Sequence, residues 1–191
     1  MNGIINVRHG DFISIHADLT QKNNSAVKLL YQIVSTPFGL MIIGGDMSGL
    51  RLCDFVNDPV EYITWYEKIN PEIVLCEGDC SLLQKVKSFL SEPLAFNDCI
   101  PVIVNATEFQ LAIWNSVLDI PWGDTTTYAK IAADAGYPAA IRAAGTAIGK
   151  NPVLFVIPCH RVVLSSGKCG NYLRGTVKKK ALLNYELVHK E

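Results

Sequence analysis

A cysteine and a histidine stand side by side in the segment V-I-P-C-H-R-V, residues 156–162. Cys159 could be a small buried hydrophobe, a metal ligand or a nucleophile. A free thiol has a pKa of about 8.5 and is only a few per cent thiolate at neutral pH, so a nucleophilic role requires a base or a positive environment. His160 and Arg161 are the nearest groups that could supply one.

The connection between Cys159 and His160 must be indirect if the backbone is extended, because neighbouring side chains then point to opposite sides. A kink at Pro158 or a bridging water would have to link the two. A carboxylate on the ring of the histidine would complete a relay, and Glu186 is the best-placed candidate in a region with few acidic residues. The pair alone does not decide between the possible roles of Cys159.

The six cysteines are scattered without a paired framework, and they are Cys53, Cys76, Cys80, Cys99, Cys159 and Cys169. The start of the chain lacks the charged-then-apolar order of an export signal, so we expect a reducing compartment and free thiols. The segment C-E-G-D-C at 76–80 is loosely compatible with zinc, but no second Cys or His pair follows at finger spacing. We predict neither a metal nor a cofactor.

The composition is that of a globular protein of 191 residues, of which 49% are apolar. No run of about 18 apolar residues could cross a membrane, so we expect a soluble intracellular protein. Residues 1–100 carry 7 Lys or Arg and 12 Asp or Glu, whereas residues 101–191 carry 10 and 6. The basic second half suggests a polyanionic partner, although an uneven solvated surface would explain the same charges.

The first half of the chain predicts a small α/β domain over residues 27–104. Residues 1–26 become polar at T-Q-K-N-N-S, and we expect them to form a loosely attached extension. Apolar runs between Val27 and Phe55, separated by T-P-F-G and D-M-S-G, predict three strands in a β-meander. The other elements expected in this domain are helices starting at Pro59 and near Asp79 and a strand at 101–104.

The second half, residues 105–191, predicts a mainly helical domain with a helix-turn-helix. A short helix over 127–135 stops at Gly136, and a second helix starts with Pro138 at its first position and ends near Gly149. The other expected elements are a helix from a capping box at Thr107 and Gln110, a buried strand at 153–157, and a last helix from Thr176 with Val177, Ala181, Leu182, Tyr185 and Val188 facing inward. Lys178–Lys180 would solvate the start of this last helix.

Small residues dominate the second helix of the helix-turn-helix, in the run Y-P-A-A-I-R-A-A-G-T-A-I-G. Tight packing against the body of the protein would explain them. Alternatively, a slim helix can approach a nucleic-acid backbone closely, which leaves Arg142 as the one long cation in its middle. A planar guanidinium there could fill the space of a displaced base.

Several motifs together are similar to the O6-alkylguanine-DNA alkyltransferases, also called methylated-DNA-protein-cysteine methyltransferases. They are T-E-F-Q-L-A-I-W, I-P-W-G-D-T-T-T-Y, G-Y-P-A-A-I-R-A-A-G, N-P-V-L-F-V-I-P-C-H-R-V-V, G-N-Y-L-R-G and K-K-A-L-L-N-Y-E, and they run from about Thr107 to Glu186. The resemblance implies an α/β fold class. It comprises a small ribonuclease-H-like N-terminal domain and a mainly helical, winged helix-turn-helix-like C-terminal domain.

The resemblance also implies direct repair of DNA, in which a thiolate takes the alkyl group from a flipped-out guanine in one irreversible step. Cys159 matches the acceptor, His160 the water-linked base, and Glu186 the carboxylate that orients it. Asn151 matches an asparagine that tethers the recognition helix to the active-site segment. The implied substrate and DNA contacts are Tyr128, which assists nucleotide rotation and can protonate the purine, Arg142, which fills the vacated stack, and Tyr172, Leu173, Val162 and Ser165 around the base.

Other functions stay open from the sequence: a binder of alkylated DNA without transfer, which would lack the acceptor cysteine, a thiol hydrolase, and a DNA-binding regulator with Cys159 in its core. Leu173 and Arg174 stand where many members of the family have smaller residues, which predicts a narrower pocket. We expect alkylated double-stranded DNA as partner, a monomer without an obligatory protein partner, and no membrane association. The expected location is the nucleoid-bearing cytoplasm of a prokaryote or the nucleus of a eukaryote.

Overall fold

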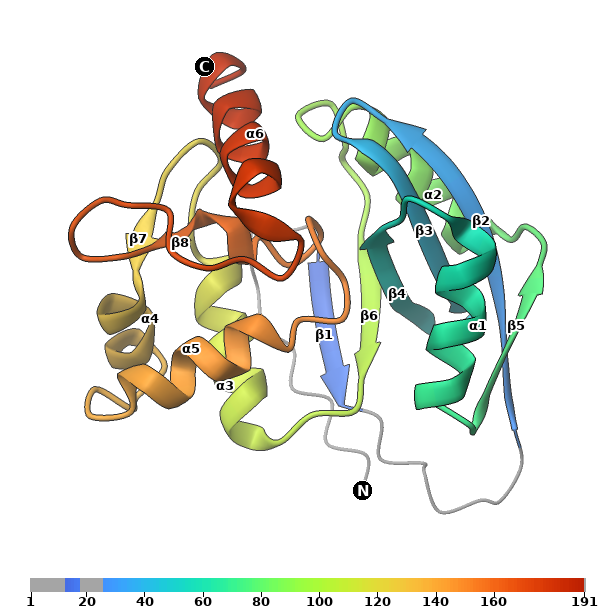
Figure 1. Cartoon of the computed structure of the whole chain (residues 1–191), viewed down its shortest axis with the longest axis horizontal. Coiled ribbons are helices and arrows are strands. Elements are labelled where there is room, and N and C mark those ends of the chain that lie inside the picture. The colour runs from blue at the N-terminus through green and yellow to red at the C-terminus, as the bar shows by residue number, and fades with distance from the viewer. Residues whose placement is uncertain (1–12, 18–25, 191) are drawn as a thin grey trace. The chain divides into compact units, whose positions relative to one another are not determined.

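The computed structural model describes residues 13–17 and 26–190, which fall into two compact units divided after Asn105 (Figure 1). The first unit is a sheet with helices, and the second is mainly helical. The expected α/β fold class, with a sheet domain followed by a helical domain, is therefore confirmed. Within the described ranges, no helix has the length and apolar character needed to span a bilayer.

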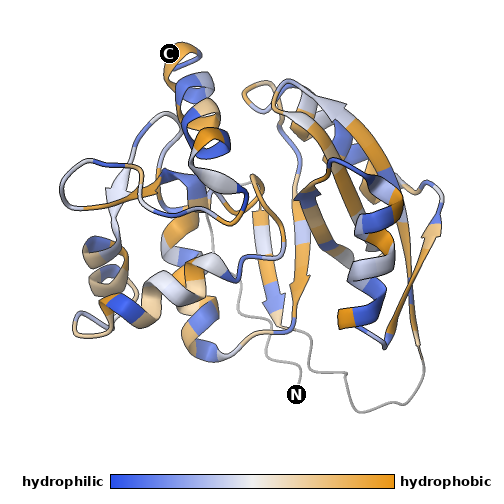
Figure 2. Ribbon diagram, viewed as in Figure 1, coloured by the Kyte–Doolittle hydropathy of each residue, from blue (hydrophilic) through white to orange (hydrophobic). Residues whose placement is uncertain are grey.

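The first unit is built on a six-stranded mixed sheet in the order β1-β6-β4-β3-β2-β5. The central three strands form the expected antiparallel meander, whereas β1 runs parallel to β6 and β5 runs parallel to β2. The apolar residues concentrate on these strands (Figure 2). The strands are β1 (Ile13–Ala17), β2 (Val27–Thr36), β3 (Gly39–Asp46), β4 (Gly49–Phe55), β5 (Ile73–Glu77) and β6 (Ile100–Val104).

Strand β1 corrects the expectation that residues 1–26 form a separate extension. All five residues of Ile13–Ala17 pair with β6, from Ile13 opposite Ile100 to Ala17 opposite Val104. The partner strand lies more than eighty residues further along the sequence, so no local turn signal could have revealed the pairing. Residues 1–12 and 18–25 of the predicted extension lie outside the described residues.

The described part of the first unit also contains the helices α1 (Pro59–Ile69) and α2 (Ser81–Ser91). Helix α1 begins as expected, because the Asp58 side chain accepts hydrogen bonds from the second and third amides of the helix. It packs Tyr62, Ile63 and Tyr66 onto a buried cluster formed by Leu29, Ile42, Leu52, Val56 and Leu75. Helix α2 begins two residues later than expected and buries Leu82, Leu83, Val86 and Leu90.

The second unit contains α3 (Glu108–Leu118), α4 (Tyr128–Asp134), α5 (Ile141–Gly149), a short 3-10 helix η1 (Cys159–Arg161) and α6 (Gly175–Val188). A small parallel ladder joins β7 (Thr126–Thr127) to β8 (Val162–Val163). The Thr107 capping box and the α4–α5 helix-turn-helix are confirmed. Helix α5 starts at Ile141 and not at Pro138, since Tyr137–Ala140 forms a turn closed by the Ala140 amide on the Tyr137 carbonyl.

The segment 153–157 is fully buried, as predicted, but it is not a strand. The Ile157 amide donates to the Val153 carbonyl, so the segment closes on itself as a tight loop. Phe155 has a φ of 72°, a conformation that costs a non-glycine residue of order 1 kcal/mol or more and often marks functional sites. An all-apolar run indicates burial on every side, but it does not identify the partner that makes a strand.

The inward face of α6 also differs from the prediction. Val177 is 83% exposed and Val188 is exposed as well, whereas Lys179, Leu182 and Glu186 are buried. The stripe that faces the body of the unit therefore carries two charged residues. Lys179 does not solvate the start of the helix, because its side chain is completely buried.

Candidate active site

The second unit contains a cavity of about 700 Å³, and Cys159 lies on its wall with 4% of its surface exposed. The cavity is lined by five further residues predicted from the sequence: Tyr128, Arg142, Ser165, Tyr172 and Leu173. The volume lies within the range typical of small-molecule sites and has room for a purine base. Arg174 is not among the lining residues, so the expected narrowing at this position finds no support.

Cys159 is held in place by Asn151. The Asn151 side-chain amide donates to the Cys159 sulfur at 3.2 Å and to the Ile157 carbonyl at 2.8 Å, while its oxygen accepts from the Val153 amide at 3.0 Å. Asn151 lies two residues after the end of α5, so these bonds tie the end of that helix to the loop that carries the thiol. These three hydrogen bonds are the contacts expected of the predicted tether, and one of them reaches the Cys159 sulfur itself.

The thiol of Cys159 is protonated at rest, because burial raises its pKa above the ordinary value. The hydrogen bond from Asn151, the charge of Lys179 and the Tyr172 hydroxyl act in the opposite direction, since they favour the thiolate, but burial outweighs them. A nucleophile in this state needs a group that takes its proton as it reacts.

His160 is placed to be that group. It is completely buried, and its Nε2 lies 2.7 Å from Oε1 of Glu186. Burial lowers the pKa of His160, and this effect outweighs the attraction of Glu186, so the ring is neutral near pH 7. A neutral ring that donates from Nε2 to the carboxylate keeps its lone pair on Nδ1. Among the described residues, Nδ1 has no hydrogen-bond partner, so it is available as a base.

Glu186 is anionic and fixed from three directions. Burial would raise the pKa of its carboxyl, but the hydrogen bonds and charges of His160 and Arg161 outweigh burial and lower this pKa to about 2. Arg161 Nε lies 2.8 Å from Oε2, Arg161 Nη2 lies 2.9 Å from Oε1, and the Gly123 amide donates to Oε2 at 3.1 Å. The predicted relay from His160 to Glu186 is therefore present as a direct contact.

Arg161 has a positioning role that the sequence did not predict. Besides holding Glu186, it donates from Nη1 to the Ile120 carbonyl at 2.7 Å, and its guanidinium lies 5.4 Å from the centre of the Trp122 ring. The Trp122 ring meets Phe155 edge-on, and Phe155 stacks on His160 with an interplanar angle of 4°. The strained Phe155 conformation thus places an aromatic ring against the imidazole ring of His160.

Lys179 is the second site residue that sequence reasoning missed. Its ammonium donates to the Val162 carbonyl at 2.5 Å and lies 5.9 Å from the centre of the Tyr128 ring. Burial lowers the pKa of Lys179, while the nearby thiols Cys159 and Cys169 favour its charged form. A signal did exist, because residues 179, 182 and 186 share one helix face and Glu186 was already assigned inward. The run Lys178–Lys180 obscured this signal, because three consecutive lysines usually indicate a solvated surface.

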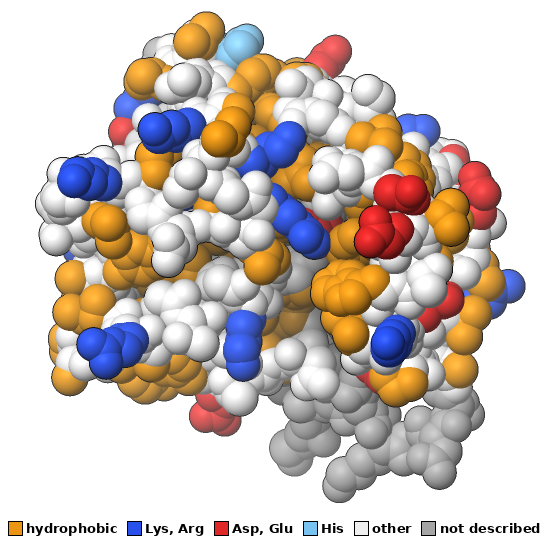
Figure 3. Space-filling model, in the orientation of Figure 1, with side chains coloured by type: hydrophobic (Ala, Val, Ile, Leu, Met, Phe, Trp, Pro, Cys, Tyr) orange, Lys and Arg blue, Asp and Glu red, His pale blue; other side chains and the backbone are white. Residues whose placement is uncertain are grey.

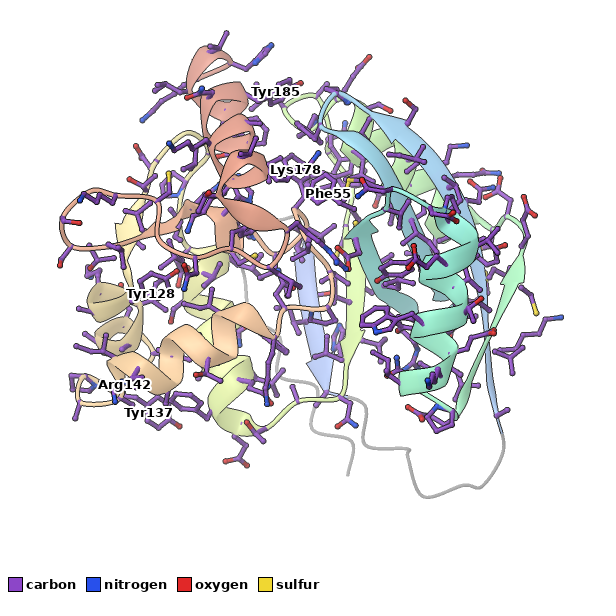
Figure 4. All side chains as sticks on the ribbon, in the orientation of Figure 1. Phe55, Tyr128, Tyr137, Arg142, Lys178 and Tyr185 are labelled. Atoms are coloured by element: carbon purple, nitrogen blue, oxygen red, sulfur yellow. The ribbon has the colours of Figure 1, made fainter. Side chains whose placement is uncertain are left out.

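Tyr128 and Arg142 come from the two helices of the helix-turn-helix (Figure 4). Tyr128 is the first residue of α4, and its ring lies against Gly145 of α5, where an added Cβ would be 3.6 Å away. Burial raises the pKa of Tyr128, so its hydroxyl keeps its proton and can donate it. Arg142 is exposed in the first turn of α5 and lines the cavity.

The remaining predicted contacts surround the cavity in different ways. Ser165 is exposed, and Leu173 is 55% exposed. Val162 is buried, and its carbonyl already accepts from Lys179, which leaves one lone pair for a base amino group. No group of three or more potential metal ligands occurs in the described part of the chain, and all six cysteines are free thiols.

Residues 108–188 match the family model described as the DNA-binding domain of 6-O-methylguanine DNA methyltransferase. An inducible methylated-DNA-protein-cysteine methyltransferase of Bacillus subtilis is 38% identical over 160 residues, which are 82% of this chain and 83% of the relative. The chain belongs to the methylated-DNA-protein-cysteine methyltransferase family. A Methanosarcina acetivorans member is 31% identical over 83% of this chain and 98% of its own length.

Solved structures of the family agree with this assignment. An O6-methylguanine methyltransferase of Mycobacterium tuberculosis superposes with a TM-score of 0.69 at 30% identity, covering 85% of this chain and 95% of that one. The Mycobacterium tuberculosis protein OGT in complex with DNA gives a TM-score of 0.67 at 29% identity, with 85% and 94% covered. The family resemblance drawn from the motifs is thereby confirmed over both units of the chain.

Proposed function

We propose that this protein repairs DNA by transferring the alkyl group of O6-alkylguanine, and of O4-alkylthymine, from a flipped-out nucleotide to the sulfur of Cys159. The observation that carries the proposal is a buried thiol on a cavity wall, followed in the chain by a buried histidine whose Nε2 is held by Glu186. The transfer is irreversible and consumes one protein molecule for each lesion, because the thioether product has no easy hydrolytic exit.

The reaction requires one proton to leave the thiol and one proton to reach the base. The Cys159 proton passes to Nδ1 of His160 through a bridging water, and Glu186 stabilises the imidazolium that results. The sulfur attacks the alkyl carbon while the carbon–oxygen bond breaks, and the electron pair of that bond stays on the guanine. Tyr128 donates a hydrogen bond or its proton to the purine as this negative charge develops.

The developing thiolate is stabilised by groups that are already in place. The Asn151 amide donates to the sulfur, and the Tyr172 hydroxyl and the Lys179 charge also favour the thiolate. Donors that are fixed before the reaction need no reorganisation when charge forms, and this makes them more effective than water. The resting protein keeps a neutral thiol, and the thiolate forms in an environment prepared for it.

The helix-turn-helix binds the DNA. Most charged side chains of the second unit on the face in Figure 3 are Lys or Arg, as phosphate binding requires. Extrusion of a nucleotide costs a few kcal/mol, and Arg142 offsets part of this by filling the vacated space. We further propose that the protein acts as a monomer without an obligatory protein partner, in the cytoplasm of a prokaryote or the nucleus of a eukaryote.

Intact-mass measurement after mixing with a duplex that carries one O6-methylguanine tests the proposal. We expect one methyl group per protein, located on Cys159 by peptide mapping, and no gain in Cys159→Ala. Cys53→Ala is the matched control, because Cys53 is also a buried free thiol but lies in the first unit. Binding of the lesion without mass gain would refute transfer, and repeated turnover by one molecule would indicate a hydrolase instead.

A further inference from the structure

On the cavity-lining face of α5, large exposed side chains occur only at the N-terminal end. Residues four apart lie in a row along a helix, and the row Ile141, Gly145, Gly149 lines the cavity together with Arg142 and Thr146 of the adjacent row. Beyond Ile141 and Arg142, the part of this face that is not buried consists of two glycines and a threonine, while Ile148, which also lines the cavity, is buried. The helix therefore presents an aliphatic and a cationic side chain next to each other, at the end of an otherwise slim surface.

Ile141 does not support the packing of the helix-turn-helix. It is 44% exposed, whereas the side chains that hold α5 in the unit are Ala144, Ala147 and Ile148, all buried. Trp114 anchors the other end of α5 by donating to the Ala147 carbonyl at 2.9 Å. A single exposed aliphatic residue is ordinary on a protein surface, but this one lines the same cavity as the exposed Leu164 and Leu173.

We infer that Ile141 acts as an apolar wedge beside Arg142, entering the base stack when the alkylated nucleotide leaves it. This inference rests on the proposed function, because it assigns a DNA contact to the same site. Its position on the cavity rim places it next to the path of a nucleotide that enters the cavity. Aliphatic side chains inserted between base steps are a known means of unstacking a duplex.

The two side chains have complementary tasks in the gap that an extruded nucleotide leaves. The gap is bounded above and below by the apolar faces of the neighbouring base pairs, and at one side by the hydrogen-bonding edge of the orphaned base. The Arg142 guanidinium can donate to that edge but leaves apolar surface in contact with water. Ile141 covers part of that surface, so the flipped state is favoured by area that a smaller side chain would leave hydrated.

Single-turnover transfer from a duplex, compared with transfer from the free base O6-benzylguanine, tests the wedge, because only the duplex reaction requires flipping. Ile141→Ala should slow the duplex reaction about tenfold, through the lost burial of three carbons. It should leave the free-base rate unchanged, and Ile141→Leu should restore the duplex rate. In a Cys159→Ala background, Ile141→Ala should reduce the fluorescence rise of a 2-aminopurine placed beside the lesion.

Val177→Ala is the matched control, because Val177 is an exposed aliphatic residue of the same unit that does not line the cavity. It should change neither rate. An equal loss on duplex and free base in Ile141→Ala would overturn the wedge and make Ile141 a cavity-wall residue. An unchanged duplex rate would overturn it as well. If the wild type reacted with neither the duplex nor the free base, the proposed function itself would be wrong, and this result differs from both outcomes above.

Discussion

The charge of Glu186 should contribute to both the stability and the reactivity of the protein, and Glu186→Gln separates the charge from the shape. Glutamine has nearly the same volume and can still accept from His160, but it cannot neutralise Arg161. In the folded protein the pKa of Glu186 is about 2, compared with 4.5 for an ordinary glutamate. The charged form is therefore favoured by folding.

The size of the effect follows from this difference. A depression of about 2.5 pKa units corresponds to about 3 kcal/mol of stability, at about 1.4 kcal/mol per unit. Because the folded pKa is the lower one, this contribution is fully present above about pH 5 and is lost as the pH falls toward 2. At pH 3 about half of it remains.

Urea unfolding of wild type and Glu186→Gln at pH 7 and pH 3 measures the contribution. We expect the variant to be less stable by about 3 kcal/mol or more at pH 7, with a gap about 1 to 2 kcal/mol smaller at pH 3. Glu108→Gln, an exposed glutamate in the first turn of α3, should change stability by less than about 1 kcal/mol. A gap of equal size at both pH values would refute the reasoning, because stabilisation would then not depend on the carboxylate charge.

Three further outcomes follow from the surroundings of the thiol. Lys179→Met should raise the pKa of Cys159 and slow transfer at pH 7 about tenfold, whereas exposed Lys180→Met should not; equal rates would exclude a role for the charge. Asn151→Ala should lower the unfolding free energy by about 2 to 3 kcal/mol in urea, since buried groups lose their partners. In the wild type at pH 7, iodoacetamide followed by peptide mapping should label exposed Cys99 before Cys159, and the reverse order would contradict a raised thiol pKa.

Much of the fold was predictable where neighbours in sequence are also neighbours in space. The β2–β4 meander, the Asp58 cap and the Thr107 capping box all depend on residues within a few positions of one another. Strand β1 was not predictable in this way, because only its pairing with β6 makes it a strand. The 153–157 loop was misassigned for a related reason: its hydrophobicity reports burial, and nothing local reports the left-handed turn at Phe155.

The site could be assigned where each residue type has one natural task. A thiol, an imidazole and a carboxylate in a helical domain already suggest a relay, and the structure places His160 and Glu186 in direct contact. The roles of the cationic residues were harder to predict. Lys179 was predicted to be solvated but is buried, and Arg161, predicted as a neighbour of Cys159, instead binds the Glu186 carboxylate. Buried charge is visible only once its partner is in place.

A thiol that rests in its neutral form suits a protein that can react only once. A preformed thiolate would be open to cellular oxidants and to alkylating agents, and each such event would remove a molecule from use. Burial raises the pKa of Cys159 and so suppresses these reactions. Asn151, Tyr172 and Lys179 favour the thiolate, and His160 is the neighbouring base. The alkylated base supplies the missing condition by filling the cavity and excluding water, which strengthens the fixed donors when charge forms. Reactivity is then greatest with the lesion bound.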